Sequence, residues 1–408
     1  MEGGIRVPDS SSPVLAASAA HPSLVHFALA VGGFAIGTTE FATMSLVPYF
    51  APDLGISVPT AGHVISAYAL GVVVGAPLIA VLSARMAQRS VLLLLMGLFA
   101  LANAASALAP SYHWMLLFRF LSGLPHGAYF GIAMLMAASL VPAQRRTVAV
   151  GRVLLGLTVA TIIGVPAANA LGQALGWRWG FGVVALLALI TVALVAAYAP
   201  RDRAHRDASP LRELGALRNG AVWLTLATGA IGFGGVFAVY TYLASTLDAV
   251  TGASPATLPF VLAAFGIGMT AGNLLVPRFA DRALTTTASV LLLWSAACLA
   301  LYPLAAQRLW SITLDVFLLG CGTALATVLQ TRLMDVAGDA QRLAAALNHS
   351  AFNFANALGP WLGGIAITAG YGWVSTGWVG CALALGGLAI WALAVRRSRA
   401  SAPQRSAG

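Results

Sequence analysis

The stretch LVHFALAVGGFAIGTTEFATMSLVPYF, residues 24–50, is an almost unbroken run of apolar and small side chains. A helix that crosses a bilayer needs about 20 mostly apolar residues, and this run is long enough. One ionisable carboxylate, Glu40 in GTTEF, lies inside it. A charged side chain within a span costs about 2.5–3.5 kcal/mol even on the permissive insertion scale, so such a residue usually faces a cavity or a partner. The stretch therefore predicts a membrane helix that carries a functional acid.

The composition of the whole chain also indicates a membrane protein. Of its 408 residues 59% are hydrophobic and only 8% are charged, and the mean hydropathy is +0.87, against about 25% charged residues in a soluble protein. The net charge of +10 comes from 22 basic residues, all of them arginine. The three cysteines, Cys298, Cys321 and Cys381, lie far apart in apolar segments, so we predict no disulfide and no metal site. We also expect no cofactor.

Twelve windows of the chain are apolar and long enough to span a membrane. They are 24–48, 61–83, 91–109, 113–139, 148–172 and 178–199 in the first half, and 221–246, 256–279, 285–305, 309–333, 343–369 and 373–395 in the second. The prediction is an all-α membrane protein with two six-helix bundles, 24–199 and 221–395, joined by a charged cytoplasmic linker, 200–220. Residues 1–23 are polar and rich in Pro and Ser, and we expect a disordered tail rather than a signal peptide. Residues 396–408 form a second cytoplasmic tail.

The positions of the arginines predict the orientation in the membrane. Nineteen of the 22 fall on one side of the predicted spans, Arg178 and Arg308 fall on the other, and Arg119 lies within a span. Short cytoplasmic loops retain positive charge. Both termini and the linker are therefore predicted to be cytoplasmic. The basic charge is explained by topology, and we expect no nucleic-acid partner.

The two halves of the chain repeat one another. A shift of 197 residues aligns Gly37 with Gly234, Gly75 with Gly272, Arg85 with Arg282 and Gly123 with Gly320, and it aligns AQR at 143–145 with AQR at 340–342. A duplicated six-helix unit explains these coincidences together. Parallel repeats of this kind, with a site at their interface, are one plan of secondary transporters.

Several stretches resemble a known family of such proteins. GTTEF, AGHVISAYALGVVVGAP (61–77), RFLSGLPHGAYFG (119–131), GVPAANALGQALGWRWGF (164–181) and NHSAFNFANALGPWLGG (348–364) resemble the major facilitator superfamily, and within it the arabinose-efflux-permease-like (AraJ-type) branch of the drug:H+ antiporter 1 family. The resemblance implies two pseudo-symmetric bundles in the bacterial inner membrane. It also implies a monomer that exports a drug, sugar or related metabolite in exchange for protons.

Three residues are candidates for proton coupling: Glu40, Arg119 and His126. Burial favours the neutral form of a carboxyl, so Glu40 could load and release a proton near neutral pH. The resemblance implies a coupling role for this acid and an interaction between Arg119 and first-span acids. His126 could relay protons. The alternatives are a structural Glu held by a hydrogen bond, an Arg paired with backbone carbonyls, and a His that only packs.

A second set of residues could line a substrate cavity. It combines aromatic and Met side chains with two asparagines of the eleventh span: Met44, Tyr68, Tyr129, Phe130, Phe237, Tyr240, Asn353 and Asn356. Residues of these types also face lipid, and Asn is a common interhelical bridge. Asp315 lies about seven residues into the tenth window, and we expect it to be partly solvated and a weaker candidate than Glu40.

Loops and glycines supply the last candidates. The resemblance implies cytoplasmic gating loops at Gly75, Arg85 and Arg89 and, in the repeat, at Gly272, Asp281 and Arg282. Ala84 replaces the acid of the first loop, which weakens that charge latch, and loop arginines also set topology. Tight helix packing or kinks are expected at Gly156, Gly164, Pro166, Gly359 and Pro360.

Two other functions compete with an exporter. A facilitator or symporter that imports sugars would share these features, because the pattern does not set direction. A polytopic membrane enzyme would need a nucleophile and a base, but the chain has no GxSxG elbow, no HExxH motif and no paired catalytic carboxylates in a span.

Overall fold

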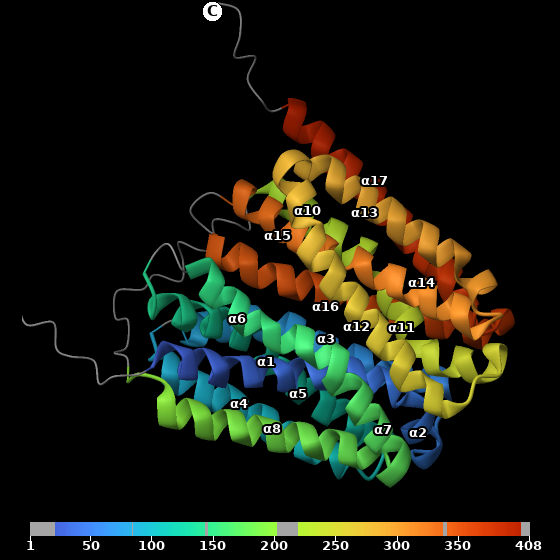
Figure 1. Cartoon of the computed structure of the whole chain (residues 1–408), viewed down its shortest axis with the longest axis horizontal. Coiled ribbons are helices and arrows are strands. Elements are labelled where there is room, and N and C mark those ends of the chain that lie inside the picture. Colours follow the sequence, from blue (N-terminus) through green and yellow to red (C-terminus); the bar gives the residue numbers. More distant parts are fainter. Residues whose placement is uncertain (1–20, 84, 143–145, 202–218, 338–340, 401–408) are drawn as a thin grey trace, which may run out of the picture.

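The computed structural model describes residues 21–83, 85–142, 146–201, 219–337 and 341–400, and in these ranges it contains helices and no strands (Figure 1). Eleven described helical segments are long and apolar enough to cross a membrane. The twelfth is α16 (Gln341–Ala366), which has 26 residues and owes its lower hydropathy to polar residues such as His349, Asn353 and Asn356. The predicted twelve-helix membrane fold is confirmed.

The first half contains six spans. They are formed by α1 (Pro22–Ser45), α3 (Val58–Ser83), α4 (Gln88–Ala107), α5 (Tyr112–Ser139), α6 (Arg146–Val159) with the π-turn η2 (Ala160–Gly164) and α7 (Val165–Leu175), and α8 (Trp177–Tyr198). The short helix α2 (Val47–Asp53) lies between the first two spans. The break in the fifth span falls at η2, directly before Pro166, which lacks a backbone N–H and cannot continue the regular ladder.

The second half repeats this order. Its spans are α10 (Gly220–Gly232) with α11 (Gly234–Thr246) and η4 (Leu247–Thr251), η5 (Pro255–Thr257) with α12 (Leu258–Leu275), α13 (Pro277–Ala305), α14 (Leu309–Gly322) with α15 (Leu325–Val336), α16 with η6 (Ile367–Tyr371), and α17 (Ser375–Ala400). In Figure 1 the helices α1 to α8 lie together in the lower part of the molecule, and α10 to α17 lie together in the upper part.

Glycines bring pairs of helices into backbone contact at equivalent places in the two bundles. A Cβ on Gly75 of α3 would collide with the carbonyl oxygen of Leu124 in α5, and a Cβ on Gly272 of α12 would collide with that of Cys321 in α14. Both members of each pair are related by the 197-residue shift. The repeat is therefore built into the packing, because only glycine permits this approach.

The two bundles meet toward the ends of their helices that lie opposite the linker, which we call the far end. The Ser66 hydroxyl of α3 donates to the Ala357 carbonyl of α16 at 2.8 Å, and the Gln173 amide of α7 donates to the Pro255 carbonyl at 3.1 Å. Gly266 of α12 lies against the backbone of Thr161. A buried apolar cluster that contains residues of both bundles surrounds these contacts.

Candidate functional site

Glu40 lies where the two bundles touch. It is on α1 and only 8% exposed, and the Nδ2 of Asn356 on α16 donates a hydrogen bond to its Oε1 at 3.3 Å. The Oδ1 of Asn356 is buried and makes no hydrogen bond within the described chain. An acid of the first bundle is thus held by an amide of the second, two residues that are 316 positions apart.

Arg119 is buried in the first bundle beside this acid, but it is bound to other groups. Its Nη1 donates to Thr39 Oγ1 at 3.1 Å and to Asn103 Oδ1 at 3.4 Å, and Thr39 itself donates to Asn103 at 2.9 Å. The guanidinium also lies 4.3 Å from the centre of the Tyr68 ring, a cation–π contact. Arg119 and Glu40 form no ion pair within 4.0 Å in the described part of the chain. The contact of Arg119 with α1 is instead its hydrogen bond to Thr39, the residue before Glu40.

His126 continues the polar network toward the second bundle. The Tyr68 hydroxyl and His126 Nδ1 are 2.9 Å apart. The His126 ring lies 6.4 Å from the ring of His349 on α16, and Phe130 stacks on His349 at 5.7 Å between ring centres. A chain of contacts therefore runs from Arg119 through Tyr68 and His126 to α16.

An aromatic cluster lies next to Glu40 at the interface. Phe41 contacts Phe237 and Tyr240 of α11 and Phe265 of α12, with ring centres 6.3, 5.5 and 6.2 Å away. The Tyr240 hydroxyl is buried without a hydrogen-bond partner in the described chain. The cluster offers apolar surface from both bundles and one unused polar atom.

The predicted cavity residues are not all in this region. Tyr129 donates its hydroxyl to the Leu29 carbonyl at 2.8 Å inside the first bundle. Met44 belongs to the apolar cluster that spans both bundles. Asn353 donates to the His349 carbonyl of its own helix at 3.0 Å, and its Oδ1 is buried without a partner in the described chain.

The family resemblance assigned Gly75 and Gly272 to gating loops, and this assignment is wrong, whereas the apolar windows 61–83 and 256–279 contain both glycines as the structure does. Gly75 lies inside α3 and Gly272 inside α12, where each allows a neighbouring backbone to approach. They belong to helices because the apolar run continues past them before the first arginine.

The charged members of the gating set lie beyond those glycines. Arg85 is exposed in a turn, and Asp281 and Arg282 are exposed in the first turns of α13. Arg89 donates to the Ala196 carbonyl near the end of α8 at 2.6 Å, a position where a cation also suits the helix dipole. Ala84 lies outside the described residues. The gating role of these residues stays a prediction.

The predicted packing residues lie at close helix contacts. Gly156 faces the Ala30 carbonyl of α1, Gly164 faces the Thr38 hydroxyl, and Gly359 faces the Gly234 carbonyl of α11. Pro166 follows η2 at the start of α7. The carbonyl of Pro360 accepts a hydrogen bond from the Tyr242 hydroxyl at 2.8 Å.

Sequence reasoning missed several members of the site. Thr39 and Asn103 form the anchor of Arg119, and Phe41 is the centre of the aromatic cluster. Asn103 is the only Asn in the third apolar window, which was a usable signal. Thr39 and Phe41 flank Glu40, but their side-chain directions follow from the helix rotation, which the sequence leaves open.

A separate charged cluster ties α2, which follows the first span, to the first residues of α8 at the far end. Asp53 Oδ2 accepts hydrogen bonds from Trp177 Nε1 at 2.9 Å and from Arg178 Nη1 at 3.0 Å. These two donors, the indole first, hold the pKa of Asp53 below its usual value. Arg178 also lies over the Trp177 ring at 4.3 Å.

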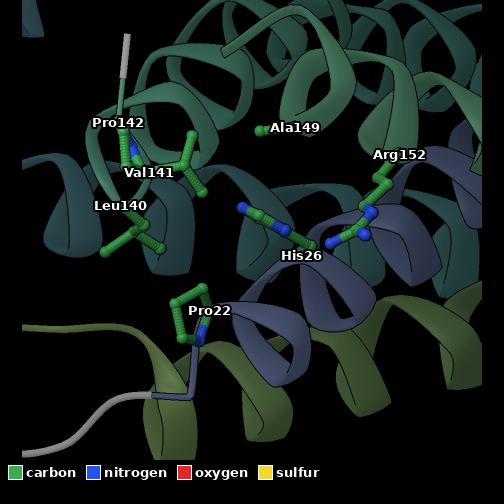
Figure 2. Close-up of a pocket in the computed structure, with 7 residues that line it drawn as sticks. All are labelled: Pro22, His26, Leu140, Val141, Pro142, Ala149 and Arg152. Atoms are coloured by element: carbon green, nitrogen blue, oxygen red, sulfur yellow. The ribbon is translucent and has the colours of Figure 1, made fainter. Parts of the chain in front are cut away.

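A pocket lies at the linker end of the first bundle, away from Glu40. It has a volume of about 250 Å³, and Figure 2 shows its lining residues: Pro22, His26, Leu140, Val141, Pro142, Ala149 and Arg152. His26 Nε2 lies 3.1 Å from the Ala137 carbonyl, to which it can donate, and its Nδ1 is buried without a partner in the described chain. The pocket shares no residue with the polar network at Glu40.

Comparison with known proteins places this arrangement in a family. A family model described as Major Facilitator Superfamily matches residues 29–342 and 242–408. The chain belongs to the major facilitator superfamily. The resemblance to this superfamily that the sequence motifs suggested is confirmed.

Individual members of the superfamily are similar along most of their length. "Inner membrane transport protein YdhP" of Escherichia coli strain K12 is 40% identical over 347 residues, which cover 85% of this chain and 89% of that protein. "Putative transporter AraJ" of the same strain is 34% identical over 348 residues, 85% and 88% of the two chains. "Chloramphenicol resistance protein" of Streptomyces lividans is 36% identical over 342 residues, 82% and 86% of the two chains.

A solved structure supports the major facilitator fold. A bacterial homolog of the human lysosomal transporter Spinster has a TM-score of 0.71 and 19% identity, with 93% of this chain and 98% of that chain covered. At this identity the likeness concerns the fold alone. The chain is thus a multi-pass membrane protein of a transporter superfamily.

Proposed function

We propose that the protein is a proton-coupled secondary transporter that exports a small molecule across the bacterial inner membrane by alternating access. The observation that carries this proposal is the hydrogen bond between Glu40 of the first bundle and Asn356 of the second. A buried acid at the interface of two repeats can link its protonation to the way in which the repeats pack.

Protonation of Glu40 changes the strength and direction of this contact. An ionised Glu40 accepts a charge-assisted bond from the Asn356 amide, a type worth about 1.5–3 kcal/mol, whereas a neutral bond contributes about 0.5–1.5 kcal/mol. A protonated Glu40 could instead donate to Asn356 Oδ1, which is buried and has no other partner in the described chain. The proton therefore alters the free energy of one bundle contact.

Arg119 allows this titration without being left unpaired. Its guanidinium is bound to Thr39, Asn103 and the Tyr68 ring, so protonating Glu40 removes no direct ion pair. Removing one partner from a buried ion pair is costly, about 3–5 kcal/mol. We infer that Arg119 positions α1 through Thr39 and supplies a fixed positive charge near the acid.

The surroundings of Glu40 suit a partly apolar molecule with hydrogen-bond donors. The aromatic cluster around Phe41 and Tyr240 supplies apolar contact, and Tyr240 Oη and Asn353 Oδ1 are unused polar atoms. The names of two relatives, "Chloramphenicol resistance protein" and "Probable sugar efflux transporter" of Helicobacter pylori, support export of a drug, a sugar or a related metabolite. The arginine distribution supports a cytoplasmic linker end.

A transport assay with a matched acid variant tests the proposal. Purified protein is reconstituted in liposomes, a pH gradient is imposed, and uptake of labelled chloramphenicol and arabinose is followed. We expect the wild type to accumulate one of these probes against its gradient, and Glu40→Gln to equilibrate it without accumulation. Asp335→Asn, at an exposed residue of α15, is the control and should behave as wild type. Accumulation by Glu40→Gln at the wild-type level would overturn the coupling role.

A further inference from the structure

A second buried carboxyl lies in the C-terminal bundle, where the proposed function has not used it. Asp315 on α14 is 7% exposed, and its Oδ2 is buried without a hydrogen-bond partner within the described chain. The expectation that this residue is partly solvated is wrong. It fails because α14 packs against both α12 and α13 at this level, which shields the side chain.

Asp315 forms no ion pair within 4.0 Å among the residues that the structure describes. From α13, Cys298 and Tyr302 lie close enough to interact with its charge, and Cys321 is the other titratable residue of α14 itself. Helix α12 carries no titratable residue. The Tyr302 hydroxyl is buried and lies next to the Thr246 side chain. None of these groups donates a hydrogen bond to Asp315 Oδ2 within the described chain.

The repeat shows that this location is the counterpart of the Arg119 site. The 197-residue shift places Arg119 on Val316, one residue after Asp315. Arg119 has hydrogen-bond partners on α1 and α4, and Tyr302 is on α13, the repeat equivalent of α4. The first bundle holds a cation whose Nη1 has hydrogen-bond partners on two helices, and the second holds an acid whose Oδ2 has no partner in the described chain.

We propose that Asp315 is a second proton-binding site, located within the C-terminal bundle and loaded from the far end. An ionised carboxylate at this depth requires donors or a cation, and Asp315 Oδ2 receives no hydrogen bond within the described chain, whereas a neutral carboxylic acid avoids the cost of burying a charge. Asp315 is six residues from the start of α14, which corresponds to about 9 Å along a helix.

The coupling of the Asp315 proton to export rests on the proposed function, whereas proton binding by Asp315 does not. Glu40 and Asp315 then each carry one proton, and two protons enter for each substrate molecule exported. Binding of the proton by Asp315 is a property of the protein without substrate, and it can be measured separately.

Infrared spectroscopy of the purified protein in lipid tests proton binding directly. Difference spectra between low and high pH are recorded for the C=O stretching band of protonated carboxyls in wild type, Asp315→Asn, Glu40→Gln and Asp335→Asn. We expect Asp315→Asn to remove one component of the band and Glu40→Gln to remove a different one, and Asp335→Asn to keep both. Asp315→Glu should restore a shifted component, which separates proton binding from a folding defect. An Asp315→Asn spectrum equal to that of the wild type would overturn the proposal.

Transport measured against the pH gradient tests the number of protons. For chloramphenicol, a neutral probe, two coupled protons predict about a hundredfold accumulation per pH unit, and one proton predicts about tenfold, because each proton contributes one decade per unit. We expect Asp315→Asn to lower the slope from two decades to one. An unchanged slope would overturn the coupled role of Asp315. Absence of accumulation by the wild type would count against the proposed function, and the infrared result would still decide whether Asp315 binds a proton.

Discussion

At the scale of single residues, the structure separates the two intramembrane charges that a family resemblance would pair. Glu40 contacts Asn356 of the other bundle, and Arg119 contacts Thr39 and Asn103 of its own. The guanidinium satisfies several acceptors in a fixed geometry, which an ammonium group cannot reproduce. We therefore infer that the arginine positions α1 and that the acid is the group that changes its charge.

The variant Arg119→Lys tests this view of the guanidinium. The lysine keeps the charge but loses the contacts with Thr39, Asn103 and the Tyr68 ring, so we expect stability to fall by about 2 kcal/mol. Thermal unfolding in detergent measures this. Arg178→Lys, at a half-exposed ion pair, is the control and should change stability by less than about 1 kcal/mol. Equal melting temperatures of Arg119→Lys and wild type would count against the positioning role.

At the scale of helices, glycines at corresponding positions of the two bundles set the distance between corresponding helix pairs. Gly123 of α5 faces the Tyr68 carbonyl of α3, and Gly320 of α14 faces the Phe265 carbonyl of α12. The 197-residue shift relates both the glycines and the residues they face. The duplicated pattern is therefore a constraint on backbone separation in each bundle.

Substitution of these glycines should be costly in both bundles. Gly123→Ala and Gly320→Ala each force two backbones apart, and we expect a loss of about 1–3 kcal/mol in each case. Gly131→Ala is the matched control on α5, because a Cβ there meets open space. It should be neutral or slightly stabilising, since alanine favours helix more than glycine by about 1 kcal/mol. Thermal unfolding compares the three, and a loss in the control as large as in the others would refute the packing argument.

The contact of α2 with α8 gives a pH-dependent stability. Asp53 has a pKa below its unfolded value because of the Trp177 and Arg178 donors. Its contribution is therefore complete above about pH 4, the unfolded value, and is lost as pH falls through the lower folded pKa. Both charged side chains are about half exposed, so the contribution is small, below about 1 kcal/mol. We expect the melting-temperature difference between wild type and Asp53→Asn to be constant from pH 7 to 5 and to vanish in stronger acid. A difference that grows on acidification would contradict this assignment.

At the scale of the whole molecule, the bundles meet through close packing of α3 on α16 and an apolar cluster that contains residues of both halves. Ser66 with Ala357 and Gln173 with Pro255 are hydrogen bonds, and Gly266 lies directly on the backbone of Thr161. Because each bundle has its own glycine-spaced helix pairs, these contacts can break while the bundles stay folded. Such an arrangement suits rocking of two rigid halves.

Gly266→Leu should separate folding from motion. The added side chain meets the backbone of Thr161 in the other bundle. We therefore expect the two bundles to stay separated at the far end and transport to be lost, with little change in thermal stability. Spin labels at Ser66 and Ala357 would report a longer distance by electron paramagnetic resonance. Gly97→Leu, at open space on α4, is the control. Wild-type transport and distance in Gly266→Leu would show that this contact does not limit the cycle.

The sequence by itself determined the membrane setting, the twelve spans and the repeat. Hydropathy, arginine counts and glycine spacing are local properties, and a bilayer or a close helix contact constrains each residue in the same way in any context. The boundaries shifted by a few residues. The apolar windows placed Gly75 and Gly272 in helices, as the structure does, and only the family resemblance assigned them to loops.

Only the tertiary structure decided which groups meet. The partner of Glu40 lies 316 residues away, and the choice between Asn356 and Arg119 depends on the rotation of α1 against α16, α4 and α5. The burial of Asp315 likewise depends on how α14 packs on its neighbours. Such rotations are set by many small packing contacts, each worth little alone, so no short stretch of sequence encodes them.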